Sequence, residues 1–189
     1  GYIGAIREII DEKLILKISK DLPNCEIRLV GPELTNFNKL KSKKNIKFLG
    51  KVSHRKIPET LSHFDIGIIP YKVNLFTNSI YPLKLNEYLA AGLPVVTTKI
   101  KTLYKFDKEN PNVIKVNNNS KEFIKSINQI RFKKLKFNKK KIKSIAKENT
   151  WNKKFVKFDE KIDHLLFEKT FYKQNLKEKL LALYNKKKF

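Results

Sequence analysis

Two charged residues near the middle of the chain, Lys84 and Glu87, have the types and the spacing of a ligand site. They are three residues apart, so on a helix their side chains would lie on nearly the same face. The free N–H groups and the positive dipole end at the start of a helix favour a bound phosphate. A lysine in the first turn adds a full positive charge at the same place. A carboxylate accepts hydrogen bonds from sugar hydroxyls. A cation for a diphosphate and a carboxylate for hydroxyls is the pair that a nucleotide-sugar would need.

The same spacing also suits an ordinary surface ion pair, which contributes little to stability. Spacing alone therefore leaves both interpretations open. Tyr71 and Phe76, which precede the pair, could stack on a base or a sugar, or could simply anchor a loop. The three histidines have no ligating neighbours at useful spacing and no Asp-X-Asp lies near the pair, so we expect no metal site.

Alternating strands and helices would place this pair at one edge of a sheet. Short apolar runs predict strands at residues 1–6, 26–30, 45–49, 65–69, 94–98 and 112–116. Asp11 and Ser53 can each cap an amphipathic helix, and the helix that contains Lys84 should end at Gly92. Repeated strand–helix–strand units predict an α/β fold with a doubly wound parallel sheet. Such sheets bind ligands beyond the carboxyl ends of their strands.

The chain changes character after residue 119, where lysine-rich helices follow one another. We predict helices at 120–130, 139–148, from Thr150 onward, and at 169–188. The expected organisation is therefore an α/β domain over residues 1–119 and a basic helical extension over residues 120–189. The apolar stripe of the last helix could pack on a domain of the protein, or the helix could lie on an anionic membrane surface.

The composition is strongly basic, with 42 Lys and Arg against 18 Asp and Glu and a net charge of +24. Such a charge attracts polyanions, although codon bias toward Lys, Asn, Ile and Phe explains it as well. A nucleic-acid-binding module is one alternative, opposed by the scarcity of arginine and the lack of a groove-reading motif. No apolar run reaches the ~20 residues that span a bilayer. The single cysteine, Cys25, excludes an internal disulfide and fits a reducing compartment.

The segment from Pro82 to Val96, PLKLNEYLAAGLPVV, resembles the donor-site signature of GT-B glycosyltransferases near glycosyltransferase family 4. Segments 1–6, 28–32 and 48–70 resemble the donor-domain strands and base-binding region in the same order, so the likeness covers about residues 1–116. It implies a Rossmann-like domain, the C-terminal half of a GT-B fold, with an acceptor-binding domain expected before Gly1. It also implies transfer of a sugar to a glycan or lipid-linked acceptor, in cell-surface polysaccharide synthesis.

The resemblance also assigns roles to individual residues. Glu87 matches a glutamate that binds the nucleotide ribose, and Lys84 matches a lysine that meets the diphosphate in some relatives. Two further stretches match the backbone against the base and the loop around the donor sugar and phosphate: Gly50, Lys51 and Val52, and Asn78, Ser79, Ile80 and Tyr81. Ser79 stands where many members have a first glutamate, and Arg7 is the only candidate for a cation after the first strand.

The resemblance implies a UDP-, GDP- or similar nucleotide-sugar as donor substrate and no separate cofactor. It implies a cytoplasmic enzyme that works at the inner face of the cell membrane, with no specific nucleic acid as partner. This chain by itself should bind the donor without turning it over. The departure at Ser79 supports a further alternative, a non-catalytic domain that keeps the fold and binds a partner or a membrane.

Overall fold

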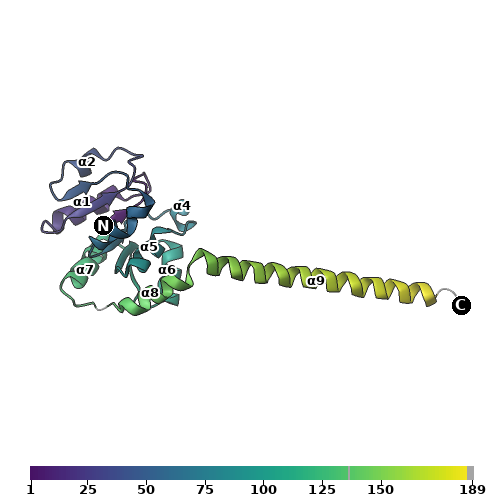
Figure 1. Cartoon of the computed structure of the whole chain (residues 1–189). Helices are drawn as coiled ribbons and strands as arrows, with labels where there is room; N and C mark the ends of the chain where they lie inside the picture. Colours follow the sequence, from purple (N-terminus) through teal and green to yellow (C-terminus); the bar gives the residue numbers. More distant parts are fainter. Residues whose placement is uncertain (136, 187–189) are drawn as a thin grey trace. The chain divides into compact units, whose positions relative to one another are not determined.

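The computed structural model describes residues 1–135 and 137–186, with side chains described to Lys179. The chain divides into two compact units, Gly1–Lys147 and Glu148–Phe189, and each is treated separately below. The first unit contains the parallel sheet and its covering helices, and the second consists mainly of one long helix, α9 (Figure 1). Within the described residues, no helix is long and apolar enough to cross a membrane.

Parallel strands form two sheets of three in the first unit, ordered β1-β2-β3 and β4-β5-β6. Their registers pair Tyr2 with Leu29 and Gly67 with Val95, among others. The bounds are β1 Tyr2–Ile3, β2 Ile27–Val30, β3 Ile46–Phe48, β4 Gly67–Ile69, β5 Val95–Thr98 and β6 Ile114–Asn117. All the predicted strands are present, and the prediction of a doubly wound parallel α/β fold is confirmed.

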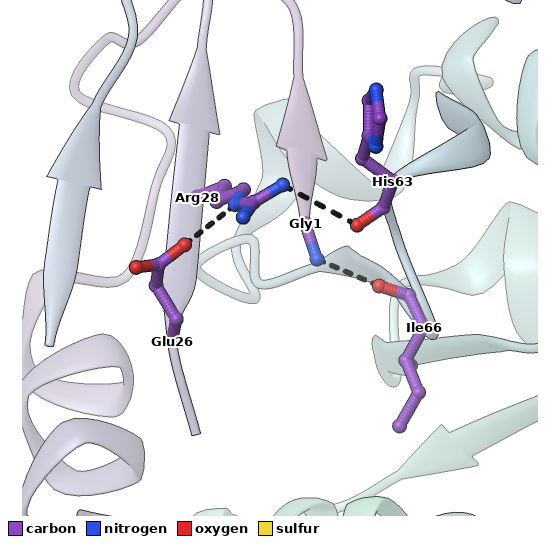
Figure 2. Close-up of polar contacts among 5 residues, drawn as sticks. All are labelled: Gly1, Glu26, Arg28, His63 and Ile66. Atoms are coloured by element: carbon purple, nitrogen blue, oxygen red, sulfur yellow. Dashed lines mark hydrogen bonds and ion pairs between the residues drawn. The ribbon is translucent and has the colours of Figure 1, made fainter. Parts of the chain in front are cut away.

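Gly1 joins the two sheets into one. Its nitrogen donates to the Ile66 carbonyl at 2.7 Å, and its carbonyl accepts from the Ile68 N–H at 2.9 Å. Figure 2 shows this contact at the amino end of β1, beside Arg28, which donates to Glu26 and to the His63 carbonyl. The combined strand order is β3-β2-β1-β4-β5-β6, so the order reverses between β1 and β4. This reversal is the topological switch point at which doubly wound sheets bind ligands.

Tyr88 fixes helix α5 (Lys84–Ala91) to the switch point. Its hydroxyl accepts from the Ile3 N–H at 3.0 Å and lies 3.3 Å from the Ile68 carbonyl, so it sits between β1 and β4. Its ring packs on Gly67, where a Cβ would come within 2.7 Å of the ring carbons. Burial raises the pKa of Tyr88, which keeps the hydroxyl neutral. The anchored ring fixes the position of Lys84 one turn earlier on the same helix.

The helices of the first unit mostly follow the sequence pattern. Asp11 caps α1, since its carboxylate accepts from the Leu14 N–H at 3.0 Å. The predicted cap at Ser53 is wrong: a short 3-10 helix begins there and the Ser53 side chain makes no capping bond. Gly92 ends α5 with a φ of 73°. The other bounds are α1 Glu12–Asp21, α2 Asn38–Lys41, η1 His54–Lys56, α3 Ile57–Ser62, α4 Leu75–Asn78, α6 Lys101–Glu109, α7 Ser120–Arg131 and α8 Lys139–Glu148.

Helices α7 and α8 belong to the α/β unit, which therefore extends to Lys147 and does not end at residue 119 as expected. Phe123 and Ile127 of α7 are buried in the same core as the strands, and so is Ile142 of α8. Helix α7 packs against β5 and β6, while the lysines of α7 and α8 remain exposed. The boundary expected at residue 119 was misplaced because the increase in lysine after that residue reflects the exposed faces of α7 and α8.

The second unit is built around α9, a single helix over Trp151–Lys186. The predicted helices from Thr150 and at 169–188 are its two halves, and residues 187–188 lie outside the described residues. No glycine or proline interrupts the segment, so nothing in the backbone ends the first half. The Thr150 hydroxyl lies 3.5 Å from the Lys153 N–H, at the position of the predicted cap.

Candidate functional site

Three glycines form the carboxyl edge of β1, β2 and β3. Gly4, Gly31 and Gly50 each follow one of these strands with a positive φ, of 122°, 142° and 67°. Gly31 donates to the Gly50 carbonyl at 2.8 Å, and Gly4 donates to the Val30 carbonyl at 2.9 Å. A Cβ on Gly31 would lie 2.1 Å from the Gly4 carbonyl oxygen. This part of the edge is therefore closely packed backbone, a surface on which a ligand can approach main-chain groups.

Backbone hydrogen bonds hold the loop after β1 on both sides of the switch point. On one side, the Ile6 N–H donates to the Pro32 carbonyl at 2.8 Å. On the other side, the Asp11 N–H donates to the Pro70 carbonyl at 2.8 Å, and the Lys72 N–H donates to the Ile9 carbonyl at 2.8 Å. The loop thus passes from the β2 side to the end of β4 with both ends fixed.

Lys84 points from the start of α5 into this switch point. Its ammonium nitrogen lies 4.7 Å from the ring centre of Tyr2 and 4.8 Å from that of Tyr71, and it donates a hydrogen bond to the Tyr71 hydroxyl. A Cβ on Gly4 would lie 3.3 Å from Cε of Lys84. Two aromatic faces therefore hold the ammonium group beside the turn that follows β1, by cation–π attraction and one hydrogen bond.

The positive charge of Lys84 has only neutral partners in the structure. Burial raises the pKa of Tyr2, and its hydroxyl donates to the Ala5 carbonyl at 2.8 Å, so this phenol stays protonated. Among the described residues no carboxylate forms an ion pair with Lys84, and Glu87 is not its partner. The surface-ion-pair alternative for the Lys84–Glu87 spacing therefore does not apply here. A half-buried cation held only by neutral groups favours a bound anion.

Glu87 faces a different part of the site. It is half-buried and lines a groove of about 560 Å³ between α3 and α5, which His54 and Arg55 also line. Ile57, Leu61 and Ala90 are among the apolar residues of the groove walls. The described residues give the Glu87 carboxylate no hydrogen bond or ion pair, so its oxygens are available to donors from a ligand.

The loop from Asn78 to Tyr81 is held by structural contacts. The Asn78 side chain accepts from the Lys101 N–H at 2.9 Å, and the Ile80 carbonyl accepts from the Thr102 hydroxyl at 2.7 Å. Both contacts attach the loop to α6, a helix that the sequence interpretation missed. The exposed Ser79 hydroxyl donates to the Leu75 carbonyl at 3.0 Å, and the Tyr81 hydroxyl donates to Asn86 at 2.9 Å.

The Gly50–Val52 stretch follows the end of β3. Gly50 has open space around its Cα on the side where a Cβ would stand. The Lys51 side chain is exposed, whereas Val52 is half-buried and packs against the core. Lys51 is therefore a cation at the same strand edge as the glycines but outside the aromatic pair that holds Lys84.

The roles of Tyr2 and Tyr71 were missed by the sequence interpretation. Tyr71 is only 3% exposed, so it does not offer a face for stacking on a base or sugar and instead holds Lys84. Phe76 is exposed, and the Arg7 guanidinium lies 6.0 Å from its ring centre. Nε of Arg7 is buried without a hydrogen bond and lies 3.7 Å from the Glu8 carboxylate. The position of Tyr71 two residues after the buried strand β4 is the signal that could have linked it to Lys84.

The described residues contain no group of three or more His, Cys, Asp or Glu side chains placed to hold a metal ion. The cation that the structure brings to the switch point is the Lys84 ammonium. A lysine ammonium can meet a phosphate without the geometric demands of a metal centre.

A parallel sheet with this strand order, covered by helices, defines a Rossmann-like α/β domain. Comparison with known proteins narrows the class. The chain belongs to the glycosyl transferases group 1 family, whose model matches residues 5–131. The family membership inferred from the segment between Pro82 and Val96 is therefore confirmed.

One curated relative is TuaH of Bacillus subtilis (strain 168), a protein named for a glycosyltransferase of teichuronic acid biosynthesis. It is 36% identical over 112 residues, which make up 57% of this chain and 28% of TuaH. The chain therefore spans well under half the length of this relative.

Solved structures of GT-B glycosyltransferases share the fold. The lipopolysaccharide outer core galactosyltransferase WaaB matches with a TM-score of 0.64 and 13% identity, over 86% of this chain and 48% of WaaB. Anabaena HepE, in a complex with UDP and glucose, matches with a TM-score of 0.61 and 16% identity, over 88% of this chain and 47% of HepE. The predicted Rossmann-like half of a GT-B fold is thus confirmed as a fold.

Proposed function

We propose that this chain is the donor-binding half of a glycosyltransferase and binds the diphosphate of a nucleotide-sugar at Lys84. The observation that carries this proposal is the Lys84 ammonium held between Tyr2 and Tyr71 at the switch point, without a carboxylate partner among the described residues. Membership in the group 1 family makes sugar transfer the reaction to which such an anion site belongs.

The proposed chemistry follows from where charge develops. In the reaction, the bond between the anomeric carbon and the diphosphate breaks, and a hydroxyl oxygen of the acceptor forms the new bond. Negative charge builds on the leaving diphosphate, and the fixed Lys84 ammonium at the start of α5 stabilises it. Glu87, in the neighbouring groove, accepts hydrogen bonds from the ribose. The acceptor and any general base would come from a second domain.

The donor, the acceptor and the location are part of the same proposal. UDP is one donor nucleotide to test because the structure of HepE holds it, and GDP is the other. The names of TuaH and WaaB refer to teichuronic acid and lipopolysaccharide, which favours a cell-surface glycan or a lipid-linked precursor as acceptor. Such acceptors favour a cytoplasmic enzyme at the inner face of the cell membrane.

We expect Glu87→Ala to weaken binding of the preferred nucleotide diphosphate by about 1.5–3 kcal/mol, the usual contribution of a hydrogen bond to a charged group. Isothermal titration calorimetry of the full chain with UDP and with GDP would measure the change. Glu59→Ala is the matched control, because Glu59 is an exposed glutamate of the facing helix α3 and does not line the groove. Equal affinities for the two variants and the parent chain would remove Glu87 from the site.

A second expectation is that excess EDTA leaves the affinity for the nucleotide unchanged. The Lys84 ammonium already supplies positive charge for a diphosphate, and the described residues offer no cluster of metal ligands. The same titration with EDTA, and then with added Mg²⁺ or Mn²⁺, measures the effect. A large loss of affinity that a divalent cation restores would show that the diphosphate is bound through a metal.

The nucleic-acid alternative depended on the lysine-rich helices that follow Ser120. In the structure, Phe123 and Ile127 of α7 and Ile142 of α8 are buried in the same core as the strands, so both helices are part of the α/β fold. The non-catalytic alternative depended on Ser79, which is exposed and donates to the Leu75 carbonyl. Binding of nucleotide and turnover are separate questions, and the titrations above address the first.

A further inference from the structure

Arg7 brings a second cation to the loop after β1. Its Nε is buried and has no hydrogen-bond partner among the described residues. Its ion pair with Glu8 is long, 3.7 Å from Nε to the carboxylate, and the Glu8 side chain is mostly exposed. Glu8 also accepts a hydrogen bond from Thr35, so its charge is shared. A half-buried guanidinium with so weak a counter-charge favours a bound anion.

The surroundings of Arg7 connect it to the site at Lys84. The Arg7 guanidinium carbon lies 6.0 Å from the ring centre of Phe76, an exposed residue of α4. Burial raises the pKa of the Tyr2 phenol, and the charge of Arg7 acts on the same group in the opposite direction. The Lys84 ammonium lies 4.7 Å from the Tyr2 ring centre. Both cations therefore lie near Tyr2, and Arg7 is the one that contacts α4.

Helix α4 adds no negative charge to this side of the site. The chain between β4 and Glu87 contains no aspartate or glutamate, and this stretch includes all of α4 and the loop that begins at Ser79. An acidic residue on α4 could pair with Arg7 and would repel an anionic ligand. Since none is present, the charge of Arg7 remains available to a ligand on the α4 side.

The ring of Phe76 indicates what kind of anion this is. A planar guanidinium can bind a carboxylate or a phosphate through two parallel hydrogen bonds. An exposed aromatic face gains by covering apolar surface, which the C–H groups of a sugar ring supply and a phosphate does not. Lys84 meets the diphosphate in the function proposed above. The group that remains for Arg7 and Phe76 is therefore an anionic sugar.

We propose that Arg7 and Phe76 bind the sugar of the donor and that this sugar carries a carboxylate, as a hexuronic acid does. The carboxylate accepts hydrogen bonds from the terminal nitrogens of Arg7, and the C–H face of the sugar ring packs on Phe76. This inference rests on the proposed function, because it requires a nucleotide-sugar whose diphosphate lies at Lys84.

The test compares ligands that differ in the sugar, by isothermal titration calorimetry of the full chain. One set is UDP, UDP-glucose and UDP-glucuronate, and the other is GDP, GDP-mannose and GDP-mannuronate. We expect the uronate of one set to bind about tenfold or more tighter than its neutral counterpart. Arg7→Met should abolish this preference and leave the affinity for the nucleoside diphosphate within about twofold. Arg7→Lys keeps the charge but not the planar fork, and should retain part of the preference.

Lys72→Met is the matched control, because it removes one positive charge from an exposed lysine whose charge also acts on Glu8. It should leave the preference for the uronate unchanged. Equal effects of Arg7→Met and Lys72→Met would mean that general basicity attracts the acidic sugar, and the inference would be wrong. Equal affinities of the parent chain for the neutral and the acidic sugar nucleotides would also contradict it. Circular dichroism of each variant checks that the fold is kept.

Two further outcomes separate this inference from the proposed function. If Arg7→Met weakens binding of the nucleoside diphosphate as much as that of the uronate, Arg7 binds the diphosphate. The carboxylate assignment is then wrong, while the proposed function stands. If the parent chain binds neither set of ligands, the proposed function fails and the inference fails with it.

Discussion

Lys84→Met is expected to weaken binding of UDP or GDP about 100-fold, because it removes the cation that Tyr2 and Tyr71 hold at the switch point. A unit charge about 4 Å from a phosphate oxygen contributes a few kcal/mol at the effective dielectric of a protein surface, and 1.4 kcal/mol corresponds to a factor of ten. Methionine keeps an apolar stem of similar length, so contact with Tyr2 and Tyr71 should survive. Calorimetry of the full chain would measure the loss.

The matched control is Lys51→Met, which makes the same change of charge on an exposed lysine that follows β3. We expect its affinity to remain within about twofold of the parent value, since an exposed charge is screened by salt. Tyr71→Phe keeps the ring and removes the hydroxyl that accepts from Lys84, so it should give an intermediate loss. If Lys84→Met and Lys51→Met behave alike, general basicity attracts the nucleotide and Lys84 has no special position.

Gly31→Ala should lower the free energy of unfolding by about 3 kcal/mol or more, or prevent folding altogether. A Cβ at this position would lie 2.1 Å from the Gly4 carbonyl oxygen, and the φ of 142° is open only to glycine. The Gly4 carbonyl cannot retreat easily, because the Gly4 N–H is bonded to Val30 and the following loop is held at both ends. Urea denaturation followed by circular dichroism would measure the change.

Gly50→Ala is the control for backbone conformation without crowding. Gly50 also has a positive φ, of 67°, but a Cβ there would meet nothing within 4 Å. The expected cost is the ordinary penalty of a left-handed residue, about 1–2 kcal/mol. Equal destabilisation by the two substitutions would mean that the close approach of the loops after β1 and β2 does not matter for stability.

The effects expected for Lys84→Met and Gly31→Ala concern the same region of the molecule, the loop after β1 and the space beside it. Gly31 allows the backbone of the loop after β1 to lie close against β2, and that loop forms one wall of the space that Lys84 enters. Tyr88 fixes α5 by its bond to Ile3, in the strand that precedes the same loop. A variant that loosens this packing without unfolding the chain should therefore also lose affinity for the nucleotide, because the ammonium group would no longer be held in one place.

Local patterns in the sequence determine most of the strands, helices and helix ends of this protein. The strands and most of the helices follow from alternation of apolar and polar residues, since each pattern concerns residues within one or two turns. Asp11 and Gly92 marked helix ends for the same reason, because capping is satisfied by neighbours in the chain. The segment from Pro82 to Val96 was enough to indicate the family. The short helix α4 and the polar α6 escaped notice because their signals are weak.

Only the tertiary structure decided how these elements meet. The sequence placed Lys84 and Glu87 on one helix face, but packing separates them: Tyr2 and Tyr71 hold the lysine at the switch point, and Glu87 lines the groove against α3. Tyr2 and Tyr71 become neighbours of Lys84 because β4 lies beside β1, an order that no local pattern specifies. The core likewise takes in α7 and α8, and so moves the boundary to Lys147. Contacts between distant residues depend on which surfaces bury each other, and that is a property of the whole fold.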